Sequence, residues 1–130
     1  MERLEWLDRL SIGNETIDSQ HRHLFELYNR MFDLSEGEID RDALLVALLN
    51  YASVHFVEEE ALMLRIEYPR VAFEAHKRQH GDFVKKLEGL RDHPVYVTLD
   101  YIREWLLRHI FIEDRRIGVF MKGAYDNSED

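Results

Sequence analysis

Apolar residues recur at three- and four-residue steps through four long stretches of this 130-residue chain, which only two prolines and six glycines interrupt. Such spacing is typical of amphipathic helices. An extended arm, residues 1 to about 17, precedes a first helix that Asp18 could cap and that residues 35–38 break. Further helices are predicted at about 40–66, 70–90 and 95–122. Short connections between long helices favour an all-α fold, an up-down-up-down antiparallel four-helix bundle, in a single domain covering residues 1–130.

The net charge and the absence of cysteine exclude several classes of partner and of chemical site. The formal net charge of −9 argues against a nucleic-acid partner and against an anionic membrane surface. No apolar stretch approaches the roughly 20 residues of a membrane helix. The absence of cysteine removes disulfides, thiolate zinc sites, iron–sulfur clusters and thiol nucleophiles. With no basic and apolar leader at the N-terminus, a cytoplasmic protein is expected.

Polar residues interrupt the apolar stripes at positions that predict a metal site. Each expected helix carries at least one of them. A buried histidine or carboxylate without a partner is costly, so several facing one core need a common reason, which a metal provides. Five of the seven histidines belong to this set, whereas His23 faces away from the stripe and His93 lies in a turn. The candidate ligands are His21, His55, Glu59, His76, His80, His109 and Asp114.

Asp114 fits helical geometry less well than the other six. It follows His109 by five residues, and a five-residue step turns about 140° around an α-helix. Both side chains reach one site only from different angles or through a local distortion of the helix. Asp114 as a surface residue is the alternative.

The ligand set indicates two metals rather than one. Seven ligands exceed the four of a tetrahedral zinc ion, and carboxylates can bridge a metal pair. The segment His76–His80 lacks the glutamate of the HExxH zinc-protease motif. No histidine follows a glutamate by three residues, as ferritin-like di-iron oxidases require. Five neutral imidazoles leave an iron pair less negative, which favours the reduced state and reversible dioxygen binding.

Four segments match a known family in their order along the chain. They are Ile17–His21; His55–Glu60 with Met63; Tyr68–Pro69 before His76, His80 and Phe83; and Trp105–Ile110 with Asp114. On these segments the chain resembles the hemerythrins, specifically the bacterial ones. One departure is a stretch between Pro69 and His76 that is about two residues longer than usual, which we expect to fall in the turn between the second and third helices.

The resemblance implies a non-haem centre of two Fe ions with an oxo or hydroxo bridge. By that resemblance His76, His80 and His109 hold one iron, and His21 and His55 hold the other, which keeps an open position for O₂. Glu59 and Asp114 bridge the two. Apolar neighbours are expected to exclude water, namely Ile17, Leu24, Phe56, Phe83, Trp105, Leu106 and Ile110.

Reversible dioxygen binding, by a carrier, storage or delivery protein and not an enzyme, is therefore the predicted function. One alternative is an O₂ or redox sensor that acts through a signalling partner. Another is a di-iron peroxidase or NO-handling enzyme, which sustained turnover would distinguish from stoichiometric binding.

Overall fold

The computed structural model describes residues 3–34 and 41–128, and within these ranges the chain is helical without a strand. A 3₁₀ turn, η1 (Asp8–Leu10), lies in the N-terminal arm, and a π-helical segment, η2 (His109–Asp114), joins the last two α-helices. The α-helices are α1 (Glu15–Asp33), α2 (Arg41–Arg65), α3 (Arg70–Gly89), α4 (Val95–Arg108) and α5 (Arg115–Ser128).

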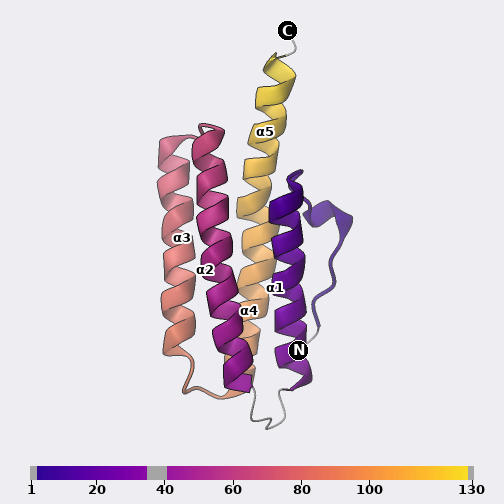
Figure 1. Cartoon of the computed structure of the whole chain (residues 1–130). Coiled ribbons are helices and arrows are strands. Elements are labelled where there is room, and N and C mark those ends of the chain that lie inside the picture. The colour runs from indigo at the N-terminus through magenta and orange to yellow at the C-terminus, as the bar shows by residue number, and fades with distance from the viewer. Residues whose placement is uncertain (1–2, 35–40, 129–130) are drawn as a thin grey trace.

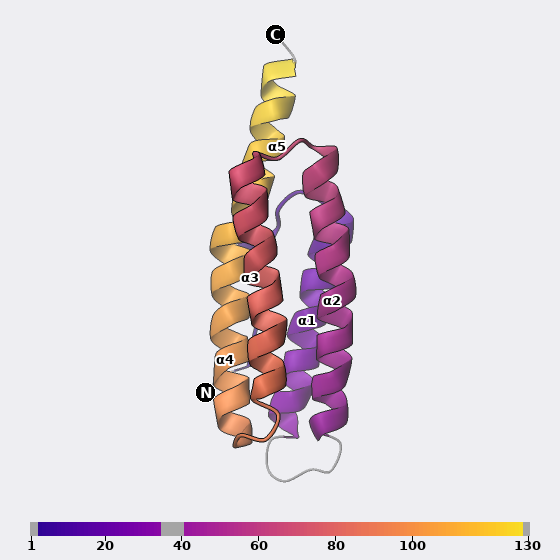
Figure 2. The same ribbon diagram turned by 90° about the vertical axis from the view of Figure 1, so that its left-hand side faces the viewer.

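Four helical columns form the bundle, because α4, η2 and α5 follow one another along a single path (Figure 1). Helix α1 packs against α2 and α4, and α3 packs against the same two helices. Successive columns run in opposite directions, and α5 continues past the end of the bundle (Figures 1 and 2). The predicted antiparallel four-helix bundle is confirmed. None of the described helices has the length and apolarity needed to span a membrane.

Two helix boundaries differ from the prediction. Asp18 does not cap α1, because the helix begins at Glu15 and the side chain of Asn14 accepts a hydrogen bond from the Ile17 amide at 3.0 Å. The fourth column continues to Ser128, about six residues beyond its predicted end. The predicted break at residues 35–38 lies outside the described residues.

The connection between α2 and α3 is short. Helix α2 ends at Arg65 and α3 begins at Arg70, directly after Pro69. The extra length expected in this turn is therefore not there. Residues 70–75 are helical, because proline is favoured just before or at the first helical position, where no amide donor is needed. The whole segment between Pro69 and His76 forms the first turns of α3.

The apolar core is divided along the bundle axis into two clusters. The larger cluster includes Tyr28, Leu48, Leu87 and Ile102. The smaller one consists of the buried residues Ile12, Ile17, Leu62, Met63 and Ile117. In α1, in α2 and along the column of α4, η2 and α5, the candidate ligands lie in sequence between buried residues of the larger and the smaller cluster. In α3, His76 and His80 lie between Phe83 of the larger cluster and Phe73, which packs partly buried against the smaller one. A polar layer is thus enclosed by apolar packing on both sides.

Hydrogen bonds hold the N-terminal arm against α1. Asp18 is buried and accepts hydrogen bonds from the Ile12 amide at 2.8 Å and from the Ser11 hydroxyl at 2.5 Å. Farther along α1, the Asn29 side chain accepts from the Leu4 amide and donates to the Leu4 carbonyl. The structural role of Asp18 is therefore to hold the arm.

At Gly118, helix α5 passes close to the backbone of the arm. A Cβ atom at this position would lie 2.6 Å from the carbonyl oxygen of Ile12. Gly118→Ala should therefore lower the free energy of unfolding by about 1–3 kcal/mol, as overpacking typically does. Gly123→Ala is the matched control in the same helix, because a Cβ there meets no atom within 4 Å. Urea unfolding of both variants measures the difference, and equal stabilities would contradict the close approach.

Candidate metal centre

The structure brings all seven predicted residues together inside the bundle. His21 comes from α1, two residues each come from α2 and α3, and η2 supplies His109 and Asp114. None is more than 4% exposed. Their potential ligand atoms form two groups, each within 4.8 Å: Glu59, His76, His80, His109 and Asp114; and His21, His55, Glu59 and Asp114. Both carboxylates belong to both groups.

Glu59 divides its two oxygens between the two groups. Its Oε1 lies 2.7 Å from Nε2 of His76 and 3.1 Å from Nε2 of His80. Its Oε2 lies 3.3 Å from Nε2 of His55 and 3.4 Å from Nε2 of His21. A carboxylate in this position can donate one oxygen to each of two cations.

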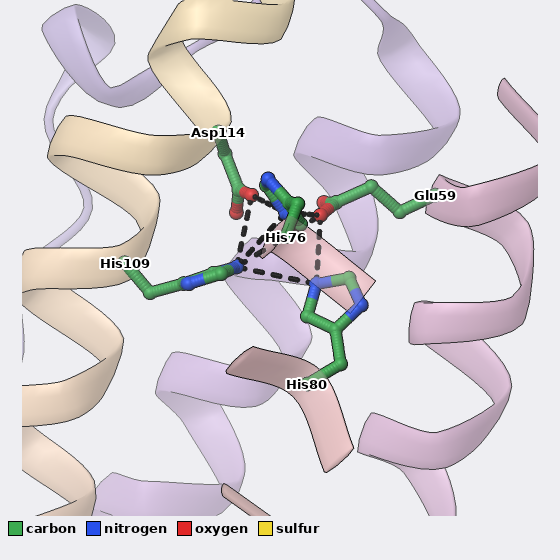
Figure 3. A group of neighbouring side chains, drawn as sticks. All are labelled: Glu59, His76, His80, His109 and Asp114. Atoms are coloured by element: carbon green, nitrogen blue, oxygen red, sulfur yellow. Dashed lines mark hydrogen bonds and ion pairs between the residues drawn. The ribbon is translucent and has the colours of Figure 1, made fainter. Parts of the chain in front are cut away.

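Asp114 divides its oxygens in the same way. Its Oδ1 lies 2.9 Å from Nε2 of His76 and 3.1 Å from Nε2 of His109, whereas its Oδ2 lies 3.0 Å from Nε2 of His21. Figure 3 shows Asp114 and Glu59 approaching the larger group from opposite columns of the bundle, with the three histidine rings pointing toward them. All five histidines present Nε2 to the centre.

The π-helical segment explains how Asp114 reaches the centre. In an α-helix His109 and Asp114 would point about 140° apart. A π-helix bonds residue i to residue i+5, which brings residues five apart to the same side. His109, Ile110 and Asp114 are buried, while Phe111 and Ile112, which lie between Ile110 and Asp114, are exposed. The π-helical distortion therefore allows both His109 and Asp114 to reach the centre despite their five-residue spacing.

Carboxylates and histidines shift one another's pKa values in the metal-free protein. Burial alone would lower the pKa of His21 and His76, but Asp114 and Glu59 outweigh it and raise these values to about 9 and about 10. Burial likewise opposes ionisation of Glu59 and Asp114, yet the surrounding histidines hold both carboxyl pKa values well below the usual range. For His55 burial prevails and lowers the pKa. At neutral pH the centre therefore holds two carboxylates and at least two protons that a metal would displace.

Several buried polar atoms of the centre lack a hydrogen bond of acceptable geometry within the described part of the chain. They are both ring nitrogens of His21, Oε2 of Glu59 and both carboxylate oxygens of Asp114. Buried polar atoms are normally satisfied, so this group calls for a partner that the side chains do not supply. Imidazole nitrogens and carboxylate oxygens without a thiolate suit non-haem iron. The residues fit a pair of iron ions.

Two residues that sequence reasoning missed fix the outer nitrogens of two histidines. Nδ1–H of His55 donates to Oε1 of Gln20 at 2.7 Å, and Nδ1–H of His80 donates to Oε2 of Glu60 at 2.9 Å. Such contacts set the tautomer and leave the Nε2 lone pair for a metal. The only available signal was position, because Gln20 precedes His21 and Glu60 follows Glu59 in the sequence.

Aromatic rings cover two of the histidines. Phe56 stacks on His80 with ring centroids 3.9 Å apart, and Trp105 stacks on His109 at 4.2 Å. Six of the seven predicted apolar neighbours are buried, and Trp105 is partly exposed. This packing limits the access of water to the centre.

His23 and His93 lie away from the centre, as predicted. The His23 side chain is 44% exposed, contacts the ring of Tyr51 at a tilted angle and lies 3.5 Å from the carboxylate of Glu26. His93 is exposed just before α4. Neither belongs to a metal-binding group among the described residues.

Known proteins match most of the length of this chain. The hemerythrin HHE cation-binding domain family matches residues 12–118, a range that includes all seven candidate ligands. A bacteriohemerythrin of Clostridium acetobutylicum is 32% identical over 124 residues, covering 85% of this chain and 95% of that protein. A bacteriohemerythrin of Stenotrophomonas maltophilia is 34% identical over 124 residues, or 88% and 79% of the two chains. Myohemerythrin-1 of Phascolopsis gouldii is 32% identical over 110 residues, or 84% and 87%.

Proposed function

The chain belongs to the hemerythrin family, and we propose that its seven buried residues hold the two iron ions of a dioxygen-binding centre. In this proposal His76, His80 and His109 bind one iron, and His21 and His55 bind the other. Glu59 and Asp114 bridge the pair. The observation that carries the proposal is that each carboxylate turns one oxygen toward each histidine group.

The side chains prepare the centre in three ways. Hydrogen bonds from Nδ1 of His55 and His80 orient these rings with Nε2 inward. The two apolar clusters exclude water from the polar layer between them. The π-helical turn brings Asp114 to the same side as His109. When bound, the iron pair supplies the electrons and the open coordination position that dioxygen binding requires.

We propose that the protein carries, stores or delivers O₂ rather than converting a substrate. The nearly complete burial of the ligands supports this, since it leaves the centre enclosed by packed side chains. A single hemerythrin-like domain is proposed for the chain, supported by a family match that spans residues 12–118. The cytoplasm is the proposed compartment, because a chain without cysteine cannot form the disulfides that stabilise many small proteins in oxidising compartments.

Anaerobic loading with Fe²⁺ tests the proposal directly. The purified protein should bind about two iron ions per chain, because the site offers two groups of ligands. Exposure to O₂ should produce a visible absorption band that disappears when O₂ is removed. Colourless protein with one zinc per chain would contradict the di-iron assignment. Sustained consumption of peroxide or NO would point to an enzyme.

A further inference from the structure

The two outer hydrogen bonds of the centre differ in charge. His55 donates to Gln20, a neutral amide, whereas His80 donates to Glu60, a carboxyl group that is 21% exposed. The two histidines belong to different metal-binding groups. A carboxylate is a stronger acceptor than an amide, since a hydrogen bond to an ionised group is roughly twice as strong as one between neutral groups. The two halves of the centre therefore differ in the charge of the group that accepts a hydrogen bond from a histidine Nδ1–H.

Helix α2 holds the ring of His80 on two sides. Adjacent residues on an α-helix point about 100° apart, so Glu59 faces the bundle axis while Glu60 faces α3. Phe56 lies one turn before Glu60 and stacks on the face of the same ring, with an interplanar angle of 8°. Glu60 thus accepts a hydrogen bond from Nδ1–H of His80, while Phe56 fixes the plane of the ring. The contacts of Glu60 go beyond those of a solvated surface acid.

We propose that Glu60 is a positioning residue that polarises His80 and biases the iron bound by His80 toward the ferric state. This inference rests on the proposed di-iron function. A carboxylate that accepts a hydrogen bond from Nδ1–H increases electron density at Nε2 and makes the imidazole a stronger donor to the metal. A stronger donor stabilises Fe(III) more than Fe(II). Gln20 holds His55 in position without adding charge, so the iron on that side lacks this bias.

In this proposal, the iron held by His76, His80 and His109 receives more electron density than the iron held by His21 and His55, because only the first has a carboxylate behind one of its histidines. The group that contains His21 and His55 offers one ligand fewer than the group that contains His76, His80 and His109. Glu60 would therefore favour the oxidised state at the metal held by the larger group. Five neutral imidazoles favour the reduced state, and Glu60 offsets part of that preference at one iron.

Redox titration of four iron-loaded proteins tests this role: the wild type, Glu60→Gln, Glu58→Gln and Gln20→Glu. Glu60→Gln keeps a hydrogen-bond acceptor but removes the charge, so the Fe(II) to Fe(III) ratio at a fixed potential should rise about tenfold, a midpoint shift of about +59 mV for one electron. Glu58→Gln removes the same charge from an exposed position on α2 and should leave the potential unchanged. Gln20→Glu adds a carboxylate behind His55 and should lower the potential.

Metal affinity supplies a second readout that needs no redox chemistry. Replacement of a residue that holds a ligating histidine typically weakens metal binding roughly 10- to 100-fold. Glu60→Ala should therefore weaken Co²⁺ binding by that factor in competition with a chelator. Glu60→Gln should bind Co²⁺ more tightly than Glu60→Ala, because an amide oxygen still accepts the hydrogen bond from Nδ1–H.

The possible outcomes separate this inference from the proposed function. Equal potentials for Glu60→Gln and Glu58→Gln, in proteins that each bind two irons, would overturn the role of Glu60 and leave the di-iron function standing. Wild-type protein that does not bind two irons would overturn both. If Glu60→Gln loses its iron, the midpoint potential of Gln20→Glu tests the inference instead. A lower potential would support polarisation of a histidine by a carboxylate, and an unchanged or higher potential would contradict it.

Discussion

Glu59→Gln should empty both metal positions at once, although the substitution changes one atom of the side chain. Each Glu59 oxygen faces a different histidine group, and an amide keeps only one oxygen and no charge. The buried histidines also lose a counter-charge. Breaking a buried ion pair by removing one partner typically costs about 3–5 kcal/mol, so the metal-free variant should be less stable as well. Iron analysis and urea unfolding measure the two effects.

Two variants serve as controls for Glu59→Gln. Glu58→Gln removes the same charge from an exposed neighbour on α2, and His23→Ala removes a histidine that lies outside the centre. Both should keep two irons per chain. A Glu59→Gln protein that retains a full iron pair would contradict the bridging role, and loss of iron in His23→Ala would contradict the described arrangement of α1.

The metal-free protein should lose stability as the pH rises from about 6.5 to 10. The pKa of His21 is raised to about 9 and that of His76 to about 10, because Asp114 and Glu59 outweigh the effect of burial. A raised folded-state pKa gives stability that is complete below the unfolded pKa of about 6.5 and is lost as the pH rises through the folded value. With two histidines involved, the loss should be on the order of several kcal/mol.

Urea unfolding at several pH values measures this loss, with metal-loaded protein as the control. Histidines that bind metal carry no proton at Nε2 to lose, so the loaded protein should show a much smaller decrease over the same range. Metal-free protein that is as stable at pH 10 as at pH 7 would contradict the ionic pairing of His21 and His76 with the carboxylates.

Most of the ligand set could be predicted from the sequence because helical periodicity reports which face is buried. His55 and Glu59 lie four residues apart on one apolar stripe, and so do His76 and His80. All four are buried in the structure. Each polar residue on such a stripe needs a polar partner. Because several such residues face one core, the sequence indicated that they share a metal as their common partner.

The remaining features depend on contacts that periodicity does not report. Asp18 and Asn14 are both good helix caps, and only the position of the arm gives Asp18 its partners at Ser11 and Ile12. From the spacing of His109 and Asp114 the sequence predicted a local distortion of the helix, but not that it is a π-helical turn. Gln20 and Glu60 are polar residues beside ligands, and their partners lie 35 and 20 residues away in sequence. Such pairings become visible only when neighbouring helices are placed side by side.

We expect the end of the bundle that contains the smaller apolar cluster to open more readily than the region of the larger cluster. Ile12, Ile17, Leu62, Met63 and Ile117 hold the arm and one end of the helices together, separated by the polar layer from the much larger cluster. Proteins open locally in units whose free energies follow the apolar contacts within them. Amide hydrogens near the smaller cluster should therefore exchange faster than those near Leu48 and Leu87. Transient opening of this end would give a small gas molecule a route to the interior without a dedicated lid.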